Sequence, residues 1–256
     1  FSENNQFNVM MRGGGKRVRY MALLDYKNKF GLLNEDYTHY SDRYNSQIRT
    51  YELGLRMNLD VDITSSTQMK FGLYGIIGED KRPNTDINTI FQNFYKVPAA
   101  AFPVKTLNNN WGSNTLFKMN PIAAIADVGY VQENRRMLET DMRITQDFSM
   151  FLKGLSAEVA VAYDNTATFQ DIGSKTYKYE VGYLSEEGLP VSETYGTDSK
   201  VQISKSALSA QLIRASVEAK LNYDYTSGKH QLSASAVYRQ DMKEPLENNA
   251  SYYRQN

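Results

Sequence analysis

The segment from Tyr51 to Ile63 alternates apolar and polar positions without exception. Apolar residues occupy every odd position, and Glu52, Arg56 and Asp60 are among the residues between them. A period of two predicts a β-strand with one apolar and one polar face. Strands of globular proteins average about 5–6 residues, whereas a strand that crosses a membrane needs roughly 9–11. This segment is therefore long enough to cross a membrane.

The same alternation recurs along the chain, and the connections between these runs are alternately short and long. Up-and-down transmembrane barrels combine short periplasmic turns with long extracellular loops in this way. We therefore predict an all-β fold, an antiparallel up-and-down transmembrane β-barrel wall that occupies residues 1–256. The predicted strands are 18–26, 51–63, 69–77, 138–150, 155–163, 215–225 and 232–238, the tight turns are 13–15, 64–66, 153–154 and 227–228, and the long loops lie near 30–46, 82–132 and 165–207.

The longest loop contains a segment with helical spacing. Apolar residues at 87, 90, 91 and 94 share one face of a helix, Asp86 can cap its first turn, and Pro98 would end it. We predict a short helix here, outside the membrane. The third loop carries a further alternating run at 177–181, which predicts strands that project beyond the membrane.

Composition narrows the possible functions. The chain has 29 basic and 29 acidic residues, so it lacks the basic field that nucleic-acid binding requires. No apolar run approaches the roughly 18 residues of a membrane helix. There are no cysteines, which excludes disulfides and thiol chemistry, and the 19 tyrosines suit interfacial aromatic belts. Residues 1–4 do not resemble a signal peptide, and we expect an internal piece of a longer chain.

Catalytic and metal-binding patterns are weak. His39 and His230, the two histidines, are far apart in the sequence. Asp60 and Asp62 lack the spacing of a calcium loop, and their alternation already explains them. Glu139 and Asp141 likewise share a polar strand face rather than a glycosidase pattern. We predict no enzyme activity, no cofactor and no metal.

Several stretches resemble the barrel region of SusC/RagA-type TonB-dependent outer-membrane transporters of the Bacteroidetes. The resemblance runs in family order over most of residues 8–164. The stretches are GGGKRVRYMALLDYKNKFGLL (Gly13–Leu33), RTYELGLRMNLDVDIT (Arg49–Thr64), NPIAAIADVGY (Asn120–Tyr130) and FLKGLSAEVAVAYD (Phe151–Asp164).

This resemblance implies active nutrient uptake through a plugged barrel of roughly 22 strands, of which this chain would supply about 8–10. It also implies a plug domain outside this sequence, a SusD-like surface lipoprotein as a lid, and TonB as the energy source. The substrate would be a glycan or an oligopeptide. A passive porin-like channel and a soluble β-rich glycan-binding module remain alternatives.

Two groups of residues are candidates for function. Glu52, Arg56, Asp60, Asp141 and Arg143 are predicted to face the lumen, where they either hold the plug or simply solvate the wall. The long 82–132 loop concentrates aromatic and amide side chains, which suit sugar or peptide recognition. The alternative is that these aromatics pack the loop against itself or a lid. The predicted ligand residues are Phe94, Tyr95, Phe102, Asn108, Asn109 and Trp111.

Overall fold

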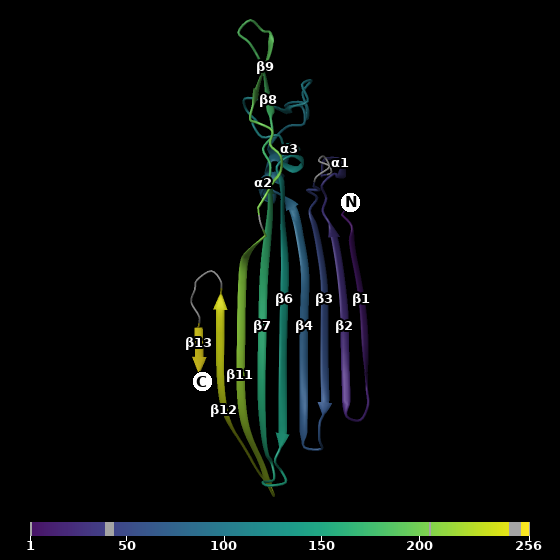
Figure 1. Cartoon of the computed structure of the whole chain (residues 1–256), viewed down its shortest axis with the longest axis vertical. Helices are drawn as coiled ribbons and strands as arrows, with labels where there is room; N and C mark the ends of the chain where they lie inside the picture. The colour runs from purple at the N-terminus through teal and green to yellow at the C-terminus, as the bar shows by residue number, and fades with distance from the viewer. Residues whose placement is uncertain (1, 39–43, 205, 246–251, 256) are drawn as a thin grey trace.

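Ten strands join in one sheet whose spatial order follows the chain (Figure 1). The computed structural model describes residues 2–38, 44–204, 206–245 and 252–255. All neighbours in this sheet are antiparallel, in the order β1-β2-β3-β4-β6-β7-β11-β12-β13, and β10 pairs with β7. The predicted all-β, up-and-down antiparallel fold is confirmed. Its strands are β1 (Asn4–Gly14), β2 (Val18–Phe30), β3 (Arg49–Asp62), β4 (Thr67–Pro83), β6 (Gly129–Asp147), β7 (Leu155–Ser174), β10 (Gln202–Ile203), β11 (Ala207–Ser227), β12 (His230–Pro245) and β13 (Tyr252–Gln255).

The register aligns the apolar positions of adjacent strands on one face of the sheet, here named the apolar face. On β2, β3 and β4 these positions cover 18–26, 53–61 and 69–77, and the strand pairing brings both ends of the three runs into line. The opposite, polar face carries the charged residues between them. The lower row of the apolar band comprises Val18, Val61, Met69, Ile144 and Val159, and its upper row includes Tyr26, Leu53 and Ile77.

Tight turns close the hairpins at one end of the sheet. They occupy 15–17, 63–66, 148–154 and 228–229. Gly154 has φ of +85°, and a Cβ there would collide with the Asp224 carbonyl oxygen. Glycine is therefore required in the lysine-glycine-leucine turn, where the Asp224 N–H donates to the Gly154 carbonyl at 2.9 Å.

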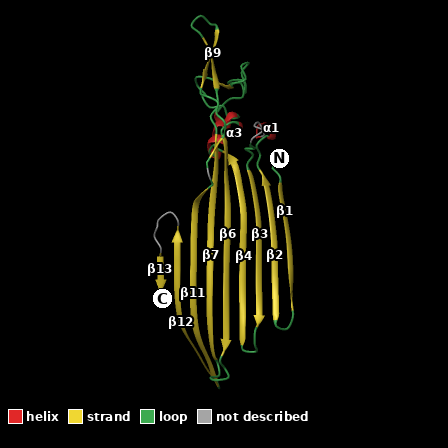
Figure 2. Ribbon diagram, in the orientation of Figure 1, coloured by secondary structure: helices red, strands yellow, loops and turns green. Residues whose placement is uncertain are grey.

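The long connections at the other end build a distal subdomain, defined here as residues 84–128 and 175–201 (Figure 2). A three-stranded sheet lies within it, in the order β5-β8-β9. The run at 177–181 therefore contributes to a separate small sheet and does not extend the main one. The remaining elements are α1 (Glu35–Thr38), α2 (Ile87–Lys96), β5 (Trp111–Ser113), α3 (Ala123–Ala126), β8 (Tyr179–Leu184) and β9 (Pro190–Tyr195).

Sequence and structure agree on the helix and differ at several boundaries: β6 begins at Gly129 inside the loop expected at 82–132, and β1, β10 and β13 were not predicted. Helix α2 has the predicted cap, because the Asp86 carboxylate accepts from the Thr89 N–H at 2.9 Å. The long connection expected from 165 begins at 175, because β7 stays paired with β6 as far as Ser174. Most buried hydrophobic residues lie in the distal subdomain and its junction with the sheet. They include Leu33, Tyr44, Ile90, Trp111, Ala123, Ala124, Ile125 and Ala126.

Candidate functional site

The five residues predicted to face the lumen share the polar face. On β3 they alternate with the leucines of the apolar band, and on β6 they occupy the matching face. Lys70 of β4 lies opposite Asp60 of β3, which has the opposite charge, and opposite Arg143 of β6, which has the same charge. The Asp60–Lys70 pairing stabilises the sheet, whereas the Lys70–Arg143 pairing opposes it.

Glu52 is the centre of an ion-pair network on this face. One of its carboxylate oxygens lies 2.7 Å from the Arg135 guanidinium, and the other lies 3.3 Å from the Lys27 ammonium. Lys27 also contacts Asp25 at 3.0 Å. Sequence reasoning missed Arg135 as a partner, because only the β3–β4–β6 register brings it beside Glu52.

The other polar-face predictions have looser contacts. Asp60 lies 3.9 Å from Arg19, and Arg143 lies 3.5 Å from Glu158. The Arg56 guanidinium lies over the Tyr74 ring at 4.7 Å. These partly exposed charges leave donors and acceptors available to a partner on the polar face.

In the distal subdomain, a buried carboxylate organises the turn between residues 106 and 110. Glu180 of β8 is 5% exposed and accepts from the Thr106 hydroxyl at 2.7 Å and from the Asn108 and Asn110 amides at 3.3 Å. Hydrogen bonds to the carboxylate lower the pKa of Glu180 to about 2. The Thr106 hydroxyl has the largest effect on this pKa, and the Ser192 hydroxyl has the next largest. Glu180 is therefore ionised at neutral pH and fixes the turn to β8.

Trp111 fills the interior of the same subdomain. Its ring is 2% exposed, and its indole N–H donates to the Asp127 carboxylate at 2.8 Å. Asp127 also pairs with Lys175, and Lys105 lies over the indole ring at 3.4 Å. Trp111 therefore packs in the interior of the subdomain, and its predicted ligand contact stays a prediction.

Asn120 connects this interior to α3. Its amide donates to the Gly112 carbonyl at 3.0 Å, and its side-chain oxygen accepts from the Ile122 N–H at 3.0 Å. Tyr44 then joins α3 to the sheet, since its hydroxyl donates to the Ala126 carbonyl at 2.9 Å. The stretch that resembles the transporter family, Asn120–Tyr130, forms the junction between the two regions.

The predicted ligand residues are distributed between surface and interior. Phe94 and Tyr95 on α2 are exposed, Tyr95 at 91%. Phe102 lies beside β5, close to Gly112. Asn108 is bound to Glu180, and the Asn109 carbonyl accepts from Lys105 at 3.3 Å. Of the six, Phe94 and Tyr95 present the most accessible rings, and a ligand role for the set stays a prediction.

The acidic residues and histidines of the described part of the chain are scattered, and its helices are short. No group of His, Cys, Asp and Glu there has a metal-binding arrangement. His230 begins β12 beside a turn, and His39 lies outside the described residues. None of the described helices is long and apolar enough to cross a membrane.

Comparisons with known proteins give a likeness of fold. No protein-family model matches the chain, and no curated protein matches it by sequence. Among solved structures, the RagAB peptide transporter matches 98% of this chain with a TM-score of 0.57 and 12% identity. The RagAB peptide importer in its closed-closed state matches with a TM-score of 0.55 and 12% identity. The chain spans 28% of the length of each matched chain, and its fold is similar to that part of the transporter.

Proposed function

We propose that this chain is part of the barrel wall of a SusC/RagA-type, TonB-dependent outer-membrane transporter that imports oligopeptides. The observation that best supports this proposal is the apolar band, the continuous belt of apolar side chains that the strand register aligns across neighbouring strands on the apolar face. On β2, β3 and β4 it is about nine residues long, which fits the roughly 9–11 residues of a tilted membrane strand. A sheet with one continuous apolar face and one charged face suits a wall between lipid and an aqueous lumen.

The connections support the same proposal. Turns lie at one end of the sheet, whereas the described parts of the long connections, 31–38, 44–48, 84–128 and 175–201, lie at the other. The turns, at the bottom of Figure 1, would then be periplasmic, and the distal subdomain, at its top, would stand on the outer side of the cell.

An oligopeptide is the favoured substrate, and a glycan is the alternative. The favouring observation is the structural likeness to a peptide transporter, together with the exposed rings of Phe94 and Tyr95. We further propose that a SusD-like lipoprotein covers the distal subdomain, that TonB supplies the energy, and that the substrate is not chemically changed. The polar face would then contact the plug through residues such as Arg56 and Asp60.

Uptake of a labelled oligopeptide pool tests this proposal. Cells that produce the full-length protein containing this chain are compared with and without TonB. Accumulation above the external concentration that requires TonB supports the proposal. If uptake stops at the external concentration and is the same with and without TonB, the protein is a passive channel instead. A protein that remains monodisperse without detergent assigns a soluble binding module.

A double variant tests the ligand residues separately. Phe94→Ala with Tyr95→Ala should weaken peptide binding by roughly tenfold or more, because aromatic contacts often dominate recognition. Leu184→Ala is the control, since Leu184 is 70% exposed in β8. Equal peptide affinity for both variants would remove Phe94 and Tyr95 from the site.

A further inference from the structure

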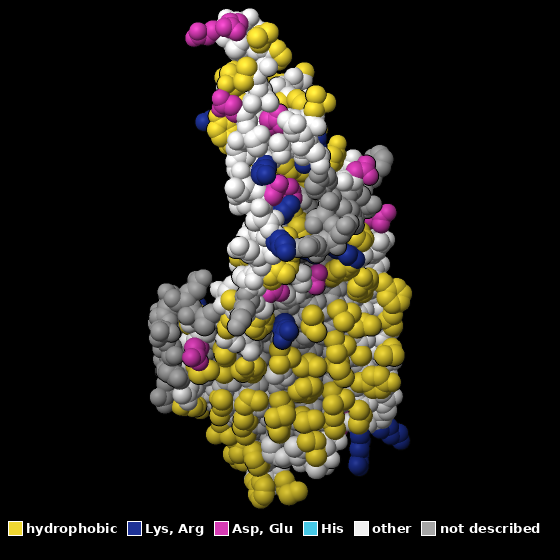
Figure 3. Space-filling model, turned by 45° about the horizontal axis from the view of Figure 1, so that its top comes forward, with side chains coloured by type: hydrophobic (Ala, Val, Ile, Leu, Met, Phe, Trp, Pro, Cys, Tyr) yellow, Lys and Arg dark blue, Asp and Glu magenta, His cyan; other side chains and the backbone are white. Residues whose placement is uncertain are grey.

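Basic residues line the upper border of the apolar face. We name Arg49, Lys81 and Arg136 the basic girdle. Arg136 extends the upper row of the apolar band, opposite Ile77, while Arg49 and Lys81 face each other near the distal ends of β3 and β4. The space-filling view shows Lys and Arg side chains at the upper border of the hydrophobic surface (Figure 3).

Aromatic rings hold each cation of the girdle. The Arg49 guanidinium lies 3.9 Å from the centre of the Tyr51 ring, and it also contacts Phe30. The Lys81 ammonium lies 4.8 Å from the Tyr130 ring centre, and Arg136 lies 5.1 Å from the Phe169 ring centre. Rings with cations above them are typical of the border between hydrocarbon and headgroups.

The three cations of the girdle have no close anionic partner in the described part of the chain. Arg49 and Lys81 are directly opposite each other, and like charges at facing positions destabilise a sheet. Within the described part of the chain, none of the three cations has a carboxylate within 4.0 Å. Glu79 and Asp171 lie on the same face; Glu79 attracts Lys81, but neither carboxylate lies within 4.0 Å of a described cation. The buried Nε of Arg49 has no hydrogen-bond partner there.

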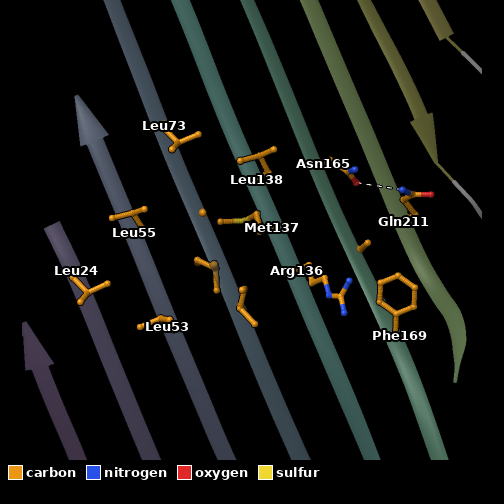
Figure 4. Close-up of a pocket in the computed structure, with 14 residues that line it drawn as sticks. Leu24, Leu53, Leu55, Leu73, Arg136, Met137, Leu138, Asn165, Phe169 and Gln211 are labelled. Atoms are coloured by element: carbon orange, nitrogen blue, oxygen red, sulfur yellow. Dashed lines mark hydrogen bonds between the residues drawn. The ribbon is translucent and has the colours of Figure 1, made fainter. Parts of the chain in front are cut away.

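An apolar groove lies directly below the girdle. Its volume is about 610 Å³, and Arg136 and Phe169 line the end that is nearer the distal subdomain, which is the lower part of Figure 4. Gly75 leaves the middle of the groove open, because a Cβ there would meet only the Met137 carbonyl oxygen at 3.8 Å. The apolar walls include Leu24, Leu53, Leu55, Leu73 and Leu138.

We propose that the girdle and groove bind an outer-leaflet lipid whose phosphorylated headgroup carries a net negative charge. This inference rests on the membrane placement in the proposed function. The phosphate lies between Arg49 and Lys81 and removes their repulsion, and Arg136 supplies a further positive charge. The acyl chains occupy the groove, whose open middle would otherwise leave the surrounding leucines poorly packed. The girdle and the groove lie next to each other, so a single amphiphile can bind both. A free anion would bind only the girdle and leave the groove empty.

Native mass spectrometry of the full-length protein in detergent tests this site. The probes are phosphatidylglycerol, phosphatidylcholine and inorganic phosphate. We expect retained phosphatidylglycerol and little retention of the other two. Arg49→Gln with Lys81→Gln should raise the apparent Kd for phosphatidylglycerol about thirtyfold, since each basic residue near an anionic surface contributes roughly fivefold. Arg56→Gln is the matched control, because Arg56 also lies over a ring but on the polar face.

A second variant tests the groove if the charge variant does not fold. Gly75→Leu fills the middle of the groove and keeps all three cations, and it should weaken retention of phosphatidylglycerol. Unchanged retention in the variants, or equal retention of phosphatidylcholine, overturns the site. Equal binding of inorganic phosphate overturns the lipid assignment. A membrane-inserted protein without anionic preference overturns only this inference, whereas a protein that needs no detergent overturns the proposed function.

Discussion

The main sheet and the distal subdomain bury their side chains in different ways. In the sheet, backbone pairing is extensive, yet leucines such as Leu53 and Leu55 stay exposed on the apolar face. In the distal subdomain, Ile90 and Trp111 are almost fully buried among their own neighbours. The sheet is therefore built to be covered by something outside the chain, whereas the distal subdomain supplies its own small core. Variants that act on one region and spare the other test this difference.

The largest effect is expected from Trp111→Ala. Removing a buried aromatic side chain costs about 3–5 kcal/mol, and the change also leaves the Asp127 carboxylate without its indole donor. Hydrogen-exchange mass spectrometry should show faster exchange at 84–128, with β3 and β4 unchanged. Leu107→Ala is the control, because Leu107 is fully exposed. Faster exchange throughout the sheet would show that the two regions do not fold separately.

A charge in the middle of the apolar band should have the next largest effect. Met57→Lys is expected to lower the free energy of unfolding from lipid by about 2–4 kcal/mol, the cost of a lysine at the bilayer midplane. Asn58→Lys, one residue away on the polar face, should change it little. Denaturant titration in lipid vesicles measures both. Equal effects for the two variants would mean that the band does not face lipid.

Acid should weaken the distal subdomain through Glu180. Its pKa is about 2 in the folded state, below the usual 4.5, so its contribution is complete above pH 4.5 and is lost as the pH falls toward 2. Glu180→Gln should cost about 1–3 kcal/mol at neutral pH, since amide donors are left without a charged acceptor. The protection factors of the amides at 106–110, which correct for the intrinsic pH dependence of exchange, should fall between pH 7 and pH 3 more in the unmodified protein than in Glu180→Gln. Glu193→Gln, on exposed β9, is the control.

Alternation along the chain predicted seven of the ten described strands of the main sheet and their faces, because side-chain direction in a strand is a local property. It did not predict β1, β10 or β13. The cap at Asp86 and the turn at Gly154 were local too. Register was not predictable, since it depends on which strands pair, and so neither the alignment of the apolar band nor the Arg135–Glu52 contact followed from the sequence. Glu180 was missed because its partners at 106–110 are distant in sequence.

The smallest effect is expected on the polar face. Arg143 lies 3.5 Å from Glu158, and half of its side chain is exposed. Solvent screens such a pair, so Arg143→Gln should change the free energy of unfolding by less than about 1 kcal/mol. The same denaturant titration measures it, with Arg143→Lys as the variant that keeps the charge. A cost close to that of Met57→Lys would mean that the polar face is dry. The proposed difference between the two faces, one in contact with lipid and the other with water, would then be wrong, because both faces would be shielded from water.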